Sequence, residues 1–251
     1  MALILLIDVT GKDGFIALAE DDVLIDSEVN NEPMQHAAFL QPSIQSLLKK
    51  NKVGLNELHA IAINNGPGSY TGLRVGLASA KGLCFALKIP LITINSLQVI
   101  AKAASLLVKE EDDIKMNENY TTIQTQINAI DTNYNDFLYC SMIDARRMEV
   151  FFALYDSLNN IIIKPSTAIV DAQFLNDYSN EHRVFYTGSG ADKFRSINEH
   201  TNFIYLPEAD TKRAFCLIAY AYFKSATFTN LLSAEPFYCK EFYNPTIKNL
   251  Q

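Results

Sequence analysis

Apolar positions recur along the chain at two spacings, one typical of strands and one of helices. Near the N-terminus, three short apolar runs are separated by turn residues, which predicts an antiparallel meander. From Pro33 the apolar residues follow helical spacing, and Pro42 is expected to kink that helix or divide it in two. The pattern predicts strands at 2–9, 14–20, 23–29, 59–64 and 90–95, and helices from 33, at 71–88 and at 96–109.

The second half of the chain repeats this order in a weaker form, after a polar, Asn-rich stretch at 110–136. Its pattern predicts strands at 137–143, 148–155, 159–163 and 183–187, a short helix after Asp171 and a longer helix at 208–223. We therefore expect two α/β lobes, 1–110 and 111–251, with a polar insertion at about 113–135. The terminal helix belongs to the second lobe, with packing against the first as an open alternative. Such lobes are typical of the actin-like, ribonuclease-H-like (ASKHA) class rather than of a dinucleotide-binding domain.

Half of the ten glycines lie between Asn64 and Gly82, where an expected strand leads into an expected helix. This stretch matches neither common phosphate-binding motif, because it has no Gly-Lys-Ser/Thr ending and Thr71 replaces the third glycine of a dinucleotide motif. Small residues recur at every fourth helical position, which predicts a close contact with another helix, inside this protein or in a partner. The residues of this row are Gly72, Gly76 and Ala80.

Composition limits the classes of function. The 251 residues include 21 Lys and Arg against 28 Asp and Glu, a net charge of −7, which disfavours unaided binding of a nucleic-acid backbone. The four cysteines and four histidines are dispersed, without the spacing of a zinc site or a disulfide framework. The apolar run from Ala2 to Ile7 has no basic flank, and no run reaches the roughly 18 apolar residues of a membrane span. We therefore expect a cytoplasmic protein that does not associate with membranes.

Several segments together resemble one family. They are Ile7-Asp8-Val9-Thr10, the stretch from Gly66 to Gly76, Met142 to Phe151, the helix at 36–48 and Glu235-Pro236-Phe237-Tyr238. With these segments the chain resembles the TsaB (YeaZ) family, bacterial subunits of the machinery that makes threonylcarbamoyladenosine in tRNA. It departs from the family's pattern in its long Asn-rich stretch and in Cys239-Lys240, where the family typically shows Leu-Arg.

The resemblance implies a paralogue of the catalytic subunit TsaD that kept the fold and lost the chemistry. Such a protein is a non-catalytic scaffold for threonylcarbamoyl transfer to the adenosine beside the tRNA anticodon. It implies dimerisation with a TsaD-like subunit, and contact with a TsaE-like ATPase and with tRNA only through the complex. It also implies no cofactor of its own, because ATP and a divalent metal are expected on the partner. A homodimer of the isolated protein stays an open alternative.

The resemblance also gives the glycine-rich helix an external role, since TsaB-like proteins pair through first-lobe helices. It implies that Thr71, Leu73, Arg74 and Leu77 surround a contact made by Gly72, Gly76 and Ala80. On this hypothesis Gly76→Leu abolishes partner binding and leaves the fold intact. If Gly76 faces the protein's own core, the same change lowers stability instead.

Two aspartates at strand ends are the remaining candidates. Asp8 stands where active actin-like enzymes organise a metal and phosphates, but the β-branched Val9 disfavours that open turn, so we expect Asp8 to be a relic of such a site or to cap a turn. We expect the same of Asp144. Arg146 and Arg147 are either solvated or bidentate donors to an anion at the lobe cleft. The weak nucleotide-binding candidates are Asp8, Gly188 and Gly190.

Two enzymatic alternatives compete with the scaffold. One is an actin-like ATPase or small-molecule kinase with its own nucleotide site, which the missing phosphate motifs disfavour. The other is a metallopeptidase, which is disfavoured because no histidine lies four residues from another, as a His-x-x-x-His metal pair requires. We therefore expect no catalytic residue and no metal ligand in this chain.

Overall fold

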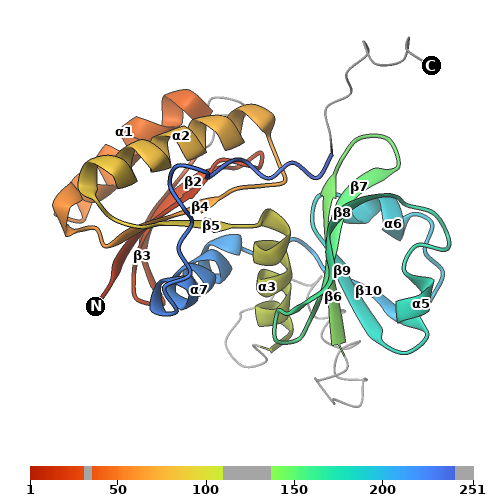
Figure 1. Cartoon of the computed structure of the whole chain (residues 1–251). Coiled ribbons are helices and arrows are strands. Elements are labelled where there is room, and N and C mark those ends of the chain that lie inside the picture. The colour runs from red at the N-terminus through yellow and green to blue at the C-terminus, as the bar shows by residue number, and fades with distance from the viewer. Residues whose placement is uncertain (31–35, 110–136, 241–251) are drawn as a thin grey trace, which may run out of the picture.

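The computed structural model describes residues 1–30, 36–109 and 137–240, which form two lobes (Figure 1). Each lobe is built on one five-stranded sheet. The first sheet contains β1 (Leu3–Asp8), β2 (Phe15–Glu20), β3 (Val23–Val29), β4 (Ala60–Asn64) and β5 (Leu91–Ile94). The second contains β6 (Phe137–Asp144), β7 (Glu149–Asp156), β8 (Ile161–Ile169), β9 (Arg183–Thr187) and β10 (Phe203–Tyr205).

The two sheets have the same topology. The strand order is β3-β2-β1-β4-β5 in the first and β8-β7-β6-β9-β10 in the second. In each sheet the first three strands along the chain pair antiparallel and the last two extend the sheet in parallel. A repeated mixed sheet of this order is the arrangement of a two-lobed, actin-like fold built from ribonuclease-H-like units. The predicted fold class is confirmed.

Helices cover the outer face of each sheet. In the first lobe these are α1 (His36–Lys50) and α2 (Tyr70–Leu87). A short 3-10 turn at Leu55–Glu57 lies between α1 and β4. Apolar residues of both helices join Leu5, Ile7 and Ile63 in one core. The helix α1 continues through Pro42, which lies on its exposed side, so the expected division in two is wrong. In the second lobe the helices that the structure describes on the outer face are α5 (Asn176–Ser179) and α6 (Ala191–Arg195).

The space between the sheets holds α3 (Ser96–Lys109) and α7 (Thr211–Lys224), and each packs on the sheet of the other half. One side of α3 joins the second sheet through Leu97, Ala101 and Ala104. The helix α7 packs Phe215 and Ile218 against the first sheet. The two lobes are therefore joined by buried apolar contacts as well as by the chain.

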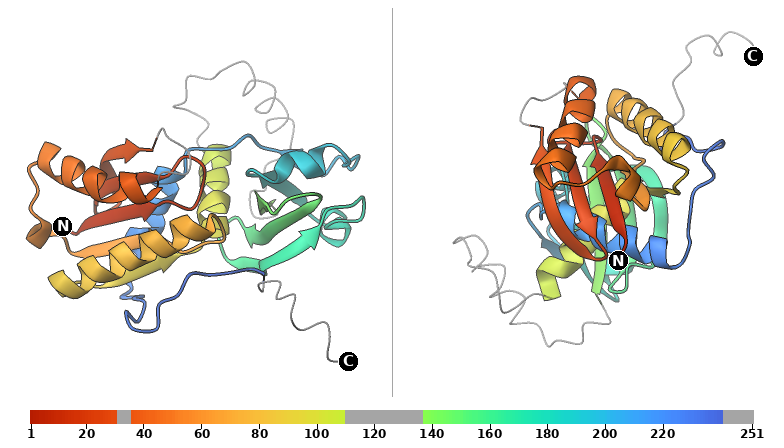
Figure 2. Two further views of the ribbon diagram at one scale, coloured as in Figure 1. Left: turned by 90° about the horizontal axis from the view of Figure 1, so that it is seen from above. Right: turned by 90° about the vertical axis from the view of Figure 1, so that its left-hand side faces the viewer.

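Other differences from the predicted elements lie in the second half. The strand β8 extends to Ile169 instead of ending at 163, and the short elements α6 and β10 were not predicted. The insertion at 113–135 and the proposed boundary between 110 and 111 lie outside the described residues, so the division into lobes at that point stays a prediction. After α7, residues 225–240 run in an irregular path along the first lobe and back toward the second (Figure 2). None of the helices described here is long and apolar enough to cross a membrane.

Candidate functional site

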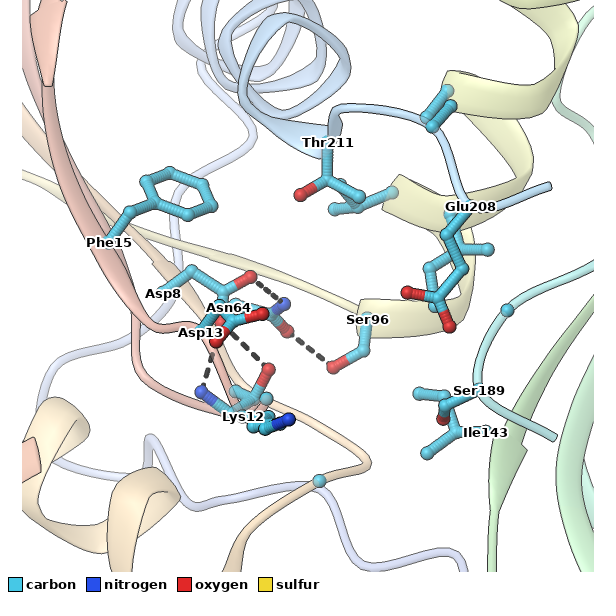
Figure 3. Close-up of a pocket in the computed structure, with 18 of the residues that line it drawn as sticks. Asp8, Lys12, Asp13, Phe15, Asn64, Ser96, Ile143, Ser189, Glu208 and Thr211 are labelled. Carbon is cyan, nitrogen blue, oxygen red and sulfur yellow. Dashed lines mark hydrogen bonds between the residues drawn. The ribbon is translucent and has the colours of Figure 1, made fainter. Parts of the chain in front are cut away.

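A cavity of about 790 Å³ lies between the lobes, at the ends of β1, β4 and β9. Figure 3 shows Asp8, Asn64 and Ser96 together on one side of it, with Glu208 and Ser189 across the gap. Its wall also includes apolar side chains of α3, among them Val99 and Ile100. The cavity is the position where the two halves of an actin-like fold meet, and it is the first candidate for a ligand site.

Asp8 is held in this cavity by donors from its own chain. Its Oδ1 accepts from the Thr10 amide at 3.0 Å and from the Thr10 hydroxyl at 2.7 Å. Its Oδ2 accepts from the Asn64 amide group at 2.7 Å, and the Asn64 oxygen accepts from the Ser96 hydroxyl at 2.6 Å (Figure 3). The carboxylate thus caps the turn after β1 and links β1, β4 and α3.

The geometry of the sheet explains this network. The strands β1 and β4 are parallel neighbours, so Asp8 and Asn64 end at the same edge of the sheet. Ser96 is the first residue of α3 and follows β5, the next strand. A buried carboxylate is costly unless hydrogen bonds satisfy it, and here three donors do so. Asp8 is therefore engaged in structure, as expected for a turn cap.

The charged side chains that line the cavity do not suit a nucleoside triphosphate. Asp8, Asp13, Glu208 and Asp210 contribute four carboxylates to its lining, against two lysines. One of these lysines, Lys212, is paired with Asp210 at 3.1 Å. The excess of negative charge opposes a polyanion. A nucleotide site of the kind that Asp8 was considered for is therefore not supported by the residues present.

Gly188 and Gly190 are needed for packing in the second lobe. A side chain at Gly188 would overlap the carbonyl oxygen of Met142, and its φ of +102° also favours glycine. A Cβ at Gly190 would lie 2.9 Å from Val150 and 3.0 Å from the carbonyl carbon of Ile143. Gly188 lines the cavity, but both glycines are explained by the close approach of their turn to β6.

Asp144, Arg146 and Arg147 lie outside the described lining of the cavity. The Asp144 Oδ1 accepts from the Arg146 amide at 2.6 Å and pairs with the Lys193 ammonium at 2.9 Å. The bond from Lys193 holds the pKa of Asp144 below its ordinary value. Asp144 thus caps the turn between β6 and β7, and both arginines are exposed with positive φ. The three residues are therefore beside the cavity rather than in its lining, because the Asp144 amide donates to the hydroxyl of Ser189, which does line it.

The glycine row of α2 faces the interior, which corrects its proposed role in an external contact. A side chain at Gly72 would overlap the carbonyl oxygen of Val9. A Cβ at Gly76 would lie 2.8 Å from Val9 and 3.1 Å from Ile63, and Ala80 is fully buried. These small residues let α2 lie close to the end of β1. Leu73 and Leu77 are also buried, so Thr71 and Arg74 are the proposed interface residues that face outward.

The outward face of α2 carries residues that the sequence analysis did not select. Phe85 is 76% exposed, and the space around Gly82 is open to at least 4 Å from its Cβ position. Ala78 and Ala86 are exposed on the same side. At the edge of this face, the Gln41 amide of α1 donates to the Ser79 hydroxyl at 3.1 Å, which ties the two helices. In the sequence, this face could have been recognised by Phe85, an aromatic residue among small residues on the side of the helical pattern that faces solvent.

Comparison with known proteins gives consistent relationships. Residues 31–114 match the model of the TsaD family, tRNA N6-adenosine threonylcarbamoyltransferase. A TsaB protein of Bacillus subtilis is 26% identical over 199 residues, covering 78% of this chain and 75% of its own. A TsaB protein of Haemophilus influenzae is 40% identical over 90 residues, covering 34% of this chain and 38% of its own. The chain therefore spans well under half of the H. influenzae protein.

The fold is shared with solved structures. The structure of YeaZ from Pseudomonas aeruginosa matches with a TM-score of 0.69 at 21% identity, covering 95% of this chain and all of that one. A second P. aeruginosa structure, described as similar to peptidase YeaZ, matches with a TM-score of 0.70 at 20% identity. At these identities the structures support the fold, and the sequence relatives support the family. The chain is therefore similar in sequence to TsaB proteins and shares the fold of YeaZ, and its residues 31–114 resemble the TsaD family.

Proposed function

We propose that this chain is a non-catalytic subunit in the synthesis of threonylcarbamoyladenosine in tRNA. Its role is to bind and support a TsaD-type subunit, which transfers the threonylcarbamoyl group to the adenosine beside the anticodon. The relatives of this chain carry the name of that biosynthesis. ATP and a divalent metal belong to the partner, and a TsaE-type ATPase and tRNA join through the complex.

The exposed face of α2 is the observation that carries this proposal. Between Arg74 and Lys88 the only charged residue is Lys81, and its ammonium donates to the carbonyl groups of Leu232 and Ala234. The rest of the face is small and uncharged around the exposed Phe85. Depletion of charge around an aromatic residue is typical of the centre of a protein interface.

The shape of this face suits another helix pair. The helices α1 and α2 lie side by side over the outer face of the first sheet (Figure 1). Residues 31–114, which include both helices, are the part that matches the TsaD model. A TsaD-type subunit is expected to present a related pair, and Ala78 and Gly82 allow helix axes to approach closely.

Gly82→Leu tests the proposed interface. The new side chain has open space in the isolated protein, so the melting temperature should not fall. It should force apart helix axes that otherwise pack at ~8–10 Å, and so weaken binding of the purified TsaD-type subunit by tenfold or more, on the order of 1.4 kcal/mol. Isothermal titration calorimetry measures the affinity. Ala221→Leu on α7 is the matched control, because Ala221 is an exposed helical alanine on the opposite side of the sheet.

Wild-type affinity of the Gly82→Leu variant would contradict the proposed interface. Failure of the wild-type protein to bind any purified TsaD-type subunit of its own cell would contradict the proposed function. Threonylcarbamoyl transfer in a reconstituted system should then require both subunits. Direct tRNA binding by this chain alone should be weak at physiological salt, because its net charge is −7.

The enzymatic alternatives make different predictions. A kinase or ATPase should release heat on titration with ATP and Mg²⁺, and turnover should vanish in Asp8→Ala. We expect neither, because the Asp8 carboxylate is satisfied by three donors of its own chain. A metallopeptidase needs a metal site, and within the described residues no group of three or more His, Cys, Asp or Glu is placed to hold a metal ion.

A further inference from the structure

Residues 225–240 form a segment, here called the C-terminal strap, that is fixed along α2. The Thr229 amide donates to the Leu91 carbonyl at 2.8 Å, and the Thr93 amide donates to the Thr229 hydroxyl at 3.1 Å. Further along, Lys81 of α2 donates to the carbonyl groups of Leu232 and Ala234. Ala234 is buried in the core beneath α2. The strap is therefore an ordered part of the first lobe, although it lacks a helix or strand.

The strap ends against the first turn of α2. The Phe237 amide donates to the Asn65 carbonyl at 2.8 Å. The Arg74 Nε donates to the Tyr238 hydroxyl at 3.1 Å, and the rings of Tyr70 and Tyr238 lie 5.8 Å apart. The Arg74 guanidinium also lies over the Tyr70 ring at 4.1 Å. This three-residue cluster holds Tyr238 beside the outward face of α2.

Large side chains are exposed in the middle of the strap and at its end against α2. Leu232 is 89% exposed, and its carbonyl is bonded to Lys81, one helical turn from Phe85, which is 76% exposed. At the end against α2, Tyr70 and Tyr238 are 43% and 36% exposed. A single exposed leucine is ordinary, but several large exposed residues along one helix face with few charges are typical of an interaction site.

We propose that the C-terminal strap supplies part of the surface that binds the TsaD-type subunit. Leu232 contacts the partner beside Phe85, and the cluster of Tyr70, Arg74 and Tyr238 contacts it at the other end of α2. This inference rests on the proposed function, because the strap is continuous with the α2 face assigned there. The partner that fits is a helix pair with an apolar, weakly charged surface, because the strip it meets is uncharged between Arg74 and the paired Lys81.

The test compares three exposed apolar side chains that are each replaced by glutamate. Leu232→Glu and Phe85→Glu should each weaken binding of the purified TsaD-type subunit by about tenfold or more, at an unchanged melting temperature. Leu158→Glu is the control, because Leu158 is 75% exposed in the turn between β7 and β8 of the other lobe. Its affinity should stay within about twofold of wild type. Leu232→Ala, which adds no charge, should weaken binding by about threefold.

The possible outcomes distinguish the role of the strap from the proposed function on which it rests. Loss of binding in Phe85→Glu with wild-type affinity in both Leu232 variants would overturn the role of the strap and leave the α2 interface standing. Wild-type affinity in all the variants would overturn the interface itself. If Leu232→Glu loses affinity and its melting temperature also falls clearly, the loss of binding would come from damage to the fold. The strap would then have a structural role, and the inference would be overturned.

Discussion

The two lobes share one sheet topology but differ in the helices on their outer faces. The first lobe carries α1 and α2, of 15 and 18 residues, whereas the equivalent α5 and α6 of the second lobe have 4 and 5 residues. Both sheets need a cover for their apolar face, and in the second lobe Phe194 of α6 and Phe174, which precedes α5, are part of that cover. Long helices add an outward surface that covering the sheet does not require. This difference supports the docking surface that we propose on the first lobe.

The same comparison explains the two aspartates and the glycine-rich turns. Asp8 ends β1 and Asp144 ends β6, the equivalent strand, and each accepts a hydrogen bond from the amide two residues later. In each lobe a glycine beyond the next parallel strand lies close to the end of this strand: Gly72, in the first turn of α2, meets the Val9 carbonyl, and Gly188 meets the Met142 carbonyl. The two lobes thus share a capped strand end and a close glycine contact, which differ in burial and in partners.

The largest expected loss of stability comes from adding a side chain at Gly72 or Gly188. Gly72→Ala and Gly188→Ala should each destabilise the protein by at least about 2–3 kcal/mol, because the added Cβ overlaps a backbone carbonyl. Chemical denaturation of each variant measures the loss. If the approaches are equivalent, both variants lose stability. If Gly188→Ala is as stable as wild type, the backbone around Gly188 can relax where that around Gly72 cannot. The two close contacts would then not be equivalent.

A smaller difference is expected between the two aspartates. Asp8→Ala should cost about 1–3 kcal/mol or more, because it leaves the buried amide of Asn64 and the hydroxyl of Thr10 without their acceptor. Asp144→Ala should cost less than about 1 kcal/mol, since its bond to Lys193 is half exposed. Thermal unfolding at neutral pH compares them. Equal losses would contradict the assignment of Asp8 as the buried tie between strands.

Gly82→Ala should stabilise the protein by up to about 1 kcal/mol, because alanine favours the helix and the Cβ meets open space. Gly76→Ala is the control on the inner side of the same helix, where the Cβ would lie 2.8 Å from Val9, and it should lose stability. Paired melting curves of the two variants check the orientation of α2. A loss at Gly82 would mean that this face is packed rather than free.

The smallest effect concerns pH. Lys193 lowers the pKa of Asp144 relative to the unfolded chain, so the ion pair contributes stability above the unfolded pKa of about 3.9. That contribution is lost as the pH falls through the lower folded pKa. The stability difference between wild type and Asp144→Asn should therefore shrink from about pH 6 toward pH 3, from a starting value below about 1 kcal/mol. A difference that does not change with pH would show that the pair contributes nothing.

The fold could be predicted where one segment determines its own structure. The helix expected at 71–88 runs from Tyr70 to Leu87, because the capping Ser69 and the apolar spacing are local signals. The short α6 and β10 have too few residues to show a period. The partners of Asp8 were not predictable either, since Asn64 and Ser96 reach it only once β1, β4 and α3 are neighbours. The inner and outer sides of α2 depend in the same way on where Val9 lies.

Because α3 and α7 each pack on the sheet of the other half, the first sheet lacks part of its cover during synthesis on the ribosome. The first sheet is complete once residues 1–94 have emerged, but its inner face awaits Phe215, whose ring lies 6.1 Å from that of Phe15. Until the end of α7 leaves the exit tunnel, Ile4 and Leu6 lack the cover that α7 provides. The nascent chain therefore exposes part of this apolar face while residues 95–224 are made, and a chaperone that binds apolar surface should bind it until α7 docks.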